Sequence, residues 1–232
     1  MATLYIVATP IGNLEDITLR AIRVLKEVDV VLCEDTRVTA KLLQKYDIKT
    51  PTLSYHSHSK LSKVEKIFSL LLEGKNLALV SDAGTPAISD PGSLLVSQIR
   101  ERISGVNGQI SNASIVPIPG PSAAIAALSA SGFPSSDFLF LGFLPHKKGR
   151  ETLFKEIAES KRTVVFYESP HRIIKALTSL KEHLKNRKIA VARELTKIHE
   201  EFLSGTAEEV IEYFNANKEK IRGEFVVMVS GK

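Results

Sequence analysis

Cysteine is almost absent from this chain: among its 232 residues there is one, Cys33. One thiol cannot form an internal disulfide or supply the four thiolates of a structural zinc site, so we expect neither disulfides nor a metal centre. No apolar run reaches the roughly 18 residues needed to cross a bilayer, and the N-terminus lacks the basic start and long apolar core of a secretory signal. The sequence therefore predicts a compact cytoplasmic protein with no membrane partner.

Several familiar motifs are missing as well. Neither GxGxxG nor GxxxxGK[ST] occurs, so the phosphate-binding loops of dinucleotide-binding and P-loop proteins have no support. A ligand without a pyrophosphate fits better. A hydrolase using Ser122, His171 and Asp82 is one alternative, but the GxSxG turn that exposes such a serine is absent.

The charge is uneven along the chain. Low-complexity tracts are absent, and a composition of 44% hydrophobic and 25% charged residues is typical of globular proteins. The formal net charge is +5, and most of the positive excess lies after residue 119. A basic surface suits an anionic partner such as RNA, although many enzymes that act on small molecules are equally basic.

Apolar patterning predicts alternating strands and helices. Short β-branched runs predict buried strands at 3–10, 28–34, 76–82, 114–119, 138–142, 163–169, 188–194 and 224–231. Apolar positions three and four apart predict helices at 19–28, 63–74, 91–102 and 171–184. This alternation predicts α/β architecture with largely parallel sheets. IPGPSA (118–123) is the predicted boundary between two α/β lobes, 1–118 and 119–232, and we expect 104–114 to be a flexible surface loop.

The segments that follow the predicted strands combine turn formers with polar side chains. They are TPIGNLED (9–16), CEDTR (33–37), SDAGTPAISDPG (81–92), PGPSA (119–123) and YESPHR (167–172). Ligands collect at the carboxyl ends of strands in open α/β sheets, so these loops predict a binding site. Gly84 lets the backbone approach a ligand, and Pro86 and Pro91 stiffen the connection. Turns between strands and helices also need Gly, Pro and capping residues for purely structural reasons.

Eight segments in order carry a family resemblance. They are ATPIGNLEDIT (8–18), CEDTRVTAKLL (33–43), SDAGTPAISDPG (81–92), PIPGPSA (117–123), GFLPHKKGR (142–150), FYESPHRI (166–173), ARELTKIHEE (192–201) and GEFVVMV (223–229). Together they resemble the small-subunit rRNA cytidine 2'-O-methyltransferases of the tetrapyrrole methylase superfamily. CEDTR and FYESPHR separate this branch from the porphyrin and diphthine methylases. The resemblance covers almost the whole chain.

The resemblance implies a fold, a reaction and a cofactor. The fold is that of a class III methyltransferase, with two α/β lobes and mostly parallel, mixed sheets, and such proteins are typically homodimers. The reaction is methylation of the ribose 2'-hydroxyl of a cytidine in the decoding region of 16S rRNA, free or within the small ribosomal subunit. S-adenosylmethionine would lie between the lobes, in contact with Pro10, Asp82, Gly84, Thr85, Ser122, Ala123, Tyr167 and Leu195.

Other assignments remain open. A methylase acting on a tetrapyrrole or a modified histidine is the main alternative within the superfamily. A regulatory module that binds the cofactor without catalysis is another, although intact CEDTR and FYESPHR loops argue against it. Asp82 could also serve only as a helix cap or turn residue.

Methyl transfer from a sulfonium is an in-line displacement, so the enzyme must chiefly hold the hydroxyl against the methyl group. A nearby base would help to remove the hydroxyl proton. The base candidates, unranked, are Asp35, Glu168 and Glu194. Glu34 and Glu168 could equally form structural ion pairs with Arg37 and Arg172.

Basic side chains near the predicted site are candidates for contacts with RNA phosphates. They are Arg37, Lys147, Lys148, Arg150, His171, Arg172 and Arg193. Exposed lysines can also be merely solvated, and Tyr167 could stack on a base or belong to the core. The loop 104–114 is longer than usual in this family, and many relatives continue beyond GEFVVMV, so we expect substrate docking to differ.

Overall fold

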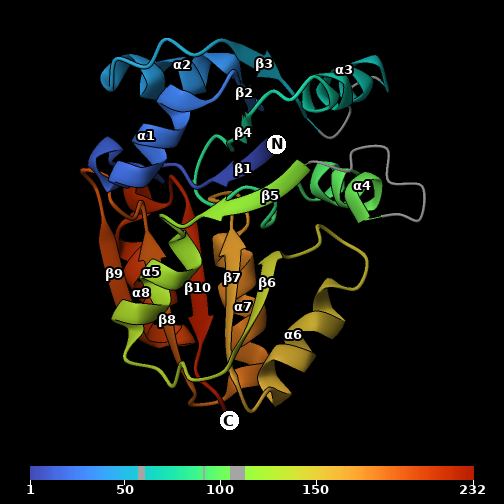
Figure 1. Cartoon of the computed structure of the whole chain (residues 1–232). Helices are drawn as coiled ribbons and strands as arrows, with labels where there is room; N and C mark the ends of the chain where they lie inside the picture. Colours follow the sequence, from blue (N-terminus) through green and yellow to red (C-terminus); the bar gives the residue numbers. More distant parts are fainter. Residues whose placement is uncertain (57–60, 91, 105–112) are drawn as a thin grey trace. The chain divides into compact units, whose positions relative to one another are not determined.

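The structure is a computed structural model that describes residues 1–56, 61–90, 92–104 and 113–232 (Figure 1). The chain forms two compact units, Met1–Ser122 (unit 1) and Ala123–Lys232 (unit 2). The domain boundary predicted at residue 118 lies close to this division. Pro91 and most of the loop expected over 104–114 lie outside the described residues.

Unit 1 is built on a five-stranded parallel sheet. Its strands are β1 (Ala2–Val7), β2 (Val30–Cys33), β3 (Thr52–Ser54), β4 (Leu77–Leu79) and β5 (Ala113–Ile118), in the order β3-β2-β4-β1-β5. All neighbouring strands pair in parallel. β4 is buried along its whole length, as expected for a strand whose two faces are both covered by helices.

Two pairs of helices cover the two faces of this sheet. α1 (Leu19–Glu27) and α2 (Thr36–Lys45) pack on one face, and α3 (Leu61–Leu72) and α4 (Gly92–Ser104) on the other. A short 3-10 helix, η1 (Leu14–Asp16), precedes α1. The Thr18 hydroxyl caps α1 by accepting a hydrogen bond from the Ala21 amide at 3.1 Å.

The strand order places a topological switch point between β1 and β4. These strands are neighbours, but the chain leaves β1 toward β2 and leaves β4 toward β5, on opposite sides. The helices that follow them lie on opposite faces of the sheet. The carboxyl ends at such a point form a natural ligand crevice. Both loops that begin there were predicted as binding loops.

Unit 2 is built on a five-stranded mixed sheet. Its strands are β6 (Phe138–Phe143), β7 (Thr163–Glu168), β8 (Lys188–Arg193), β9 (Glu201–Thr206) and β10 (Phe225–Val229), in the order β6-β7-β10-β8-β9. β6 and β7 are parallel, and the other three pairs are antiparallel. The two sheets confirm the predicted α/β class with parallel and mixed sheets.

The helices of unit 2 are distributed unequally (Figure 1). α6 (Arg150–Glu159), α7 (Ile173–Leu184) and α8 (Ala207–Ala216) cover one face of the sheet and enclose the larger core of this unit. α5 (Ala123–Ser131) packs on the other face through Ala124, Ala127 and Leu128. A short 3-10 helix, η2 (Lys218–Lys220), follows α8. Aromatic side chains therefore remain partly open on the α5 face.

The predicted strands and helices are all present, most with narrower bounds. β3 and β9 escaped prediction because β3 has three residues and β9 carries polar ones. In the ranges that the structure describes, every helix is too short or too polar to span a bilayer. Within the same ranges, no group of three or more His, Cys, Asp and Glu side chains is arranged to hold a metal ion.

Candidate functional site

The loops that follow β1 and β4 are joined by backbone hydrogen bonds. The Thr9 amide donates to the Gly84 carbonyl at 2.9 Å, and the Gly84 amide donates to the Thr9 carbonyl at 3.1 Å. The buried Thr9 hydroxyl also donates to the Ser81 carbonyl at 3.0 Å. Gly84 has a φ of +82°, a region in which residues with a Cβ are strained. The two loops therefore form one rigid surface at the switch point.

The loop that follows β5 joins this surface. A Cβ on Gly120 would lie 2.9 Å from the Cβ of Ala8, so glycine is required for the close approach. The Thr85 hydroxyl donates a hydrogen bond to the Pro121 carbonyl at 3.1 Å. We call the joined segments 8–10, 81–85 and 119–122 the unit 1 shelf. It contains the predicted cofactor residues Pro10, Asp82, Gly84, Thr85 and Ser122.

A small cavity of about 50 Å³ lies beside the shelf. Its walls are formed by Thr9, Pro10, Leu14, Val38, Thr39, Leu42, Ser81 and Asp82. The Thr39 hydroxyl is buried, and the thiol of Cys33 lies within hydrogen-bonding reach of it. The cavity therefore has both polar and apolar walls beside the shelf.

Exposed carboxylates lie at the carboxyl ends of the unit 1 strands, beside the shelf. Asp82 is exposed, and its Oδ1 accepts a hydrogen bond from the Asp35 amide at 3.2 Å. Partial burial raises the pKa of Glu34, the negative charges of Asp90 and Asp82 raise it further, and His56 opposes them. Burial is the largest cause of the raised pKa, and the contributions of Asp90 and Asp82 reflect a negative potential at this edge of the sheet. A cationic ligand would be stabilised there.

Asp35 is engaged at the start of α2. Its Oδ1 accepts a hydrogen bond from the Arg37 amide at 2.8 Å and caps the helix. The exposed Arg37 guanidinium pairs with the same carboxylate at 2.6 Å. These bonds lower the pKa of Asp35 to about 2. Arg37 therefore pairs with Asp35 and not with Glu34, and Asp35 is a weak proton acceptor in this arrangement.

In unit 2, Glu168 lies between two arginines. Its side chain is fully buried; one carboxylate oxygen is 2.5 Å from Arg150 Nη2, and the other is 2.9 Å from Arg172 Nε. The Ser169 amide also donates to this carboxylate at 2.8 Å. Both carboxylate oxygens of Glu168 are thus engaged. The structural ion pair with Arg172, one of the alternatives from the sequence, is present.

The same two arginines hold the loop that follows β6. Arg150 Nη1 donates to the Pro145 carbonyl at 3.1 Å, and Arg172 Nη1 donates to the Leu144 carbonyl at 3.2 Å. We call residues 145–149 the basic loop; its side chains Lys147 and Lys148 are exposed, as is nearby His171. Arg150 itself is 8% exposed. Its charge neutralises Glu168 in the interior, and the lysines of the basic loop are left facing solvent.

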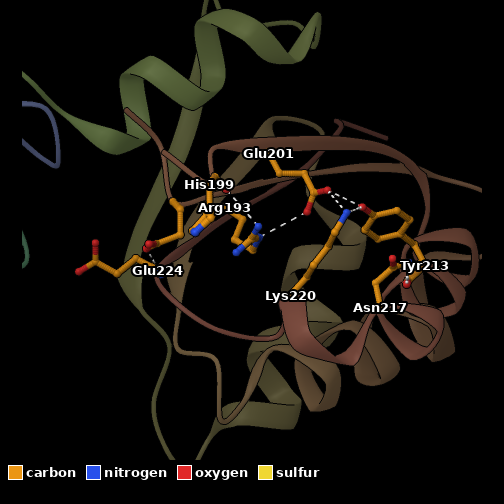
Figure 2. Close-up of polar contacts among 8 residues, drawn as sticks. Arg193, His199, Glu201, Tyr213, Asn217, Lys220 and Glu224 are labelled. Atoms are coloured by element: carbon orange, nitrogen blue, oxygen red, sulfur yellow. Dashed lines mark hydrogen bonds and ion pairs between the residues drawn. The ribbon is translucent and has the colours of Figure 1, made fainter. Parts of the chain in front are cut away.

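A second network holds the loop between β8 and β9 (Figure 2). Arg193, predicted to bind RNA, is 5% exposed; its Nε lies 3.4 Å from Glu201, and its Nη2 donates to the His199 carbonyl at 3.0 Å. Glu201 also pairs with Lys220 at 2.7 Å and accepts a hydrogen bond from the Tyr213 hydroxyl. Arg193 is therefore committed to internal contacts.

The outer end of that loop is held by Glu194. The Glu224 amide and Lys197 Nζ donate to its Oε1 at 3.0 and 2.8 Å. Burial opposes ionisation, but these bonds outweigh it and lower the pKa of Glu194. Glu194 and Thr196 both have positive φ angles, so the turn on either side of Leu195 is strained and closely defined.

The predicted residues fall into separate groups. In unit 2, Ala123, Tyr167 and Leu195 pack on one apolar cluster on the α5 face, and the Ala124 amide donates to the Tyr167 hydroxyl at 3.3 Å. Each of the three base candidates has a cationic partner within its own unit, Asp35 in unit 1 and Glu168 and Glu194 in unit 2. Sequence reasoning considered Glu34 only as a structural partner of Arg37 and did not single out Thr39. The position of Glu34 at the end of a predicted strand could have pointed to it.

Comparison with known proteins places the chain in a family. The model of the tetrapyrrole (corrin/porphyrin) methylases matches residues 3–211. Among solved structures, a cobalt precorrin-4 methyltransferase shares 20% sequence identity and a TM-score of 0.68, covering 98% of this chain and 94% of the other. A diphthine synthase shares 12% identity and a TM-score of 0.69, covering 99% and 90%. At these identities the structures establish the fold.

Several named relatives share more of the sequence. Ribosomal RNA small subunit methyltransferase I from Halalkalibacterium halodurans is 50% identical, over 99% of this chain and 76% of its own. The protein of that name from Thermotoga maritima is 47% identical over the full length of both chains. The one from Bacillus subtilis is 49% identical over all of this chain and 76% of its own.

The chain belongs to the tetrapyrrole methylase family. The methyl donor of this family is S-adenosylmethionine. The predicted resemblance to the small-subunit rRNA methyltransferases of this family is confirmed by the relatives just described.

Proposed function

We propose that this protein transfers a methyl group from S-adenosylmethionine to the ribose 2'-hydroxyl of a cytidine in the decoding region of 16S rRNA. The carrying observation is the identity of 47–50% with relatives named ribosomal RNA small subunit methyltransferase I, over almost the whole chain. The site supports it, because unit 1 offers an acidic shelf for a cation and unit 2 offers exposed basic side chains for a polyanion.

The unit 1 shelf suits S-adenosylmethionine. The cofactor supplies an electrophilic methyl group on a positively charged sulfonium. Asp82 can accept hydrogen bonds from its amino or ribose groups, and the surrounding carboxylates favour its positive charge. The rigid backbone near Pro10, Gly84 and Thr85 offers fixed donors and acceptors at the switch point. On the unit 2 side, contacts from Ala123, Tyr167 and Leu195 remain part of the proposal.

The chain contributes to the chemistry mainly through positioning. Asp35, Glu168 and Glu194 each have a cation as partner, and the pKa is lowered for Asp35 and Glu194. A carboxylate stabilised in this way accepts a proton less readily. The proposal therefore assigns most of the acceleration to holding the hydroxyl in line with the methyl group in a water-poor site.

The RNA contacts are reassigned on the same grounds. Lys147, Lys148 and His171 are exposed and keep their proposed role toward phosphates, as does Arg37. Arg150, Arg172 and Arg193 instead hold the loops of unit 2 from inside. The homodimer and the cytoplasmic location stay predictions.

Methyl transfer from labelled S-adenosylmethionine to small ribosomal subunits lacking this modification tests the proposal. We expect label in 16S rRNA, at one cytidine that resists alkaline cleavage on its 3' side because the 2'-hydroxyl is blocked. Purified 16S rRNA and a precorrin substrate serve as comparison acceptors. Transfer to the precorrin and to neither RNA substrate would refute the proposal in favour of a tetrapyrrole methylase.

A further inference from the structure

An aromatic side chain stands exposed at the end of β6. Phe143 is 58% exposed, whereas Leu144, the next residue, is 1% exposed. A phenylalanine usually contributes to stability by leaving water, so an exposed ring at a strand end has little value for the fold. Phe143 is not among the candidates for the general base or among the proposed cofactor residues. Its placement calls for a functional explanation.

A β-bulge directs this ring to the α5 face. Phe140 and Phe143 are three residues apart, an odd spacing that would put them on opposite faces of a regular strand. Both nevertheless contact the ring of Tyr167, with centroid distances of 5.1 and 5.4 Å. The register of β6 against β7 shifts between them, and Gly142 has a φ of +60°. Bulges of this kind reorient side chains, often beside active sites.

The ring is held on one side and open on another. Tyr167 contacts Phe140 edge to face, and its hydroxyl accepts a hydrogen bond from the Ala124 amide at 3.3 Å. Phe143 packs against this fixed tyrosine at an interplanar angle of 59°. A ring supported in this way loses little conformational entropy when another flat group packs on it.

Positive charge begins a few residues further along the chain. The basic loop follows Leu144, and the bond from Arg150 to the Pro145 carbonyl fixes its first residue. Lys147 and Lys148 are exposed on it. An exposed aromatic ring beside lysines is the combination with which proteins bind single-stranded nucleic acid, since bases stack on the ring and phosphates meet the charges.

We propose that Phe143, supported by Tyr167, is a stacking platform for an unpaired base of the RNA substrate, with neighbouring phosphates on Lys147 and Lys148. This inference rests on the proposed function and assigns a base-binding residue within it. A second copy of this chain packing on Phe143 is the competing occupant, and charge complementarity to RNA favours the base.

Substitutions of Phe143 can distinguish ring stacking from simple apolar contact and so test the stacking role. The probes are unmodified small ribosomal subunits in the methylation assay and a fluorescein-labelled single-stranded RNA of the decoding region. We expect Phe143→Ala and Phe143→Leu to weaken RNA affinity and raise KM about tenfold to a hundredfold, and Phe143→Trp to restore both. The salt dependence and the affinity for S-adenosylmethionine should stay at wild-type values, because stacking involves no ion release.

Leu139→Ala is the matched control, because Leu139 is an exposed apolar residue of the same strand. If Phe143→Ala leaves RNA affinity and KM unchanged while the wild-type protein methylates its substrate, the stacking role of Phe143 is wrong and the proposed function stands. Full activity of Phe143→Leu would also refute the stacking role, because leucine keeps apolar contact without a stacking face. A change of sedimentation coefficient in Phe143→Ala would instead assign the residue to a protein interface. If wild-type protein methylates neither subunits nor 16S rRNA, the proposed function itself fails.

Discussion

The loops that follow the parallel strands are held in place differently in the two units. In unit 1 the loops are joined by backbone hydrogen bonds, such as those between Thr9 and Gly84, and the carboxylates of Glu34 and Asp82 are exposed beside them. In unit 2 the loops are held by side-chain ion pairs around Glu168 and Glu201. Acidic groups are thus retained on the surface in one unit and neutralised internally in the other.

This difference matches the two partners of the proposed reaction. A sulfonium is a small cation and needs a short-range negative site with a rigid wall, which backbone groups provide. A polyanion needs accessible positive charge, and a free carboxylate beside Lys147 and Lys148 would repel it. Burying Glu168 between Arg150 and Arg172 removes that repulsion while fixing the loop that carries the lysines. Breaking each arrangement should therefore have a different consequence.

The largest effect is expected from Glu168→Gln. The change leaves Arg150 and Arg172 without their buried counter-ion, and removing one partner of such a pair costs about 3–5 kcal/mol. Chemical denaturation of the whole protein measures the loss in the free energy of unfolding. Glu151→Gln is the control, because Glu151 is exposed on the neighbouring helix and should change stability by about 0.5 kcal/mol or less. A loss below about 1 kcal/mol for Glu168→Gln would contradict the internal role.

In unit 1 the corresponding change should affect binding and spare stability. Asp82→Ala removes an exposed carboxylate from the shelf, and we expect the affinity for S-adenosylmethionine to fall about tenfold or more, because hydrogen bonds to charged groups are among the stronger ones. Isothermal titration calorimetry measures the affinity, and Glu27→Gln on α1 is the control for loss of one negative charge. Equal affinities for wild type and Asp82→Ala would remove Asp82 from the cofactor site.

Replacing both Lys147 and Lys148 with alanine should affect RNA binding by unit 2 and leave cofactor binding by unit 1 unchanged. We expect weaker RNA binding and a slope of log affinity against log salt smaller by about 1.4, or roughly 0.7 for each phosphate of single-stranded RNA that a lysine no longer neutralises. Filter binding across a salt series measures the slope. Changing Lys41 and Lys45 of α2 to alanine removes the same charge from unit 1. Equal slopes in the two double variants would show that net charge alone matters.

The sequence predicted the turns of the unit 1 loops better than the ion pairs that hold the loops of unit 2. Gly84 and the prolines of the unit 1 loops indicate turns from the local sequence alone, and parallel strands bring those turns to the same edge of the sheet. The pairing of Glu168 with Arg172 lies within one motif and was among the open alternatives. Arg150 lies eighteen residues from Glu168, and nothing local indicates that its guanidinium turns inward.

Phe143 and Arg193 show the same limit. The exposure of Phe143 depends on a bulge whose register is defined only by pairing with β7. Arg193 reads as a surface cation in ARELTKIHEE, yet antiparallel pairing of β8 with β9 sets it opposite Glu201. Interactions fixed by sheet register thus escape local patterns, whereas interactions fixed by turn chemistry do not.

The smallest effect concerns the pH dependence of cofactor binding, and it distinguishes the open carboxylates from the engaged ones. The pKa of Glu34 lies above its ordinary value of 4.5 because of burial and neighbouring negative charge. A bound cation favours the ionised carboxylate and lowers that pKa in the complex. Between the two values binding releases a proton, so affinity for S-adenosylmethionine should fall as pH drops through the raised pKa, by less than about tenfold per pH unit. Calorimetry between about pH 7 and pH 4.5 measures this affinity.

Glu34→Gln is the variant that tests the assignment, because it should make the affinity nearly independent of pH in this range. Asp35, with a pKa of about 2, keeps its charge and the α2 cap throughout. If Glu34→Gln shows the same pH dependence as the wild type, the cation binds elsewhere.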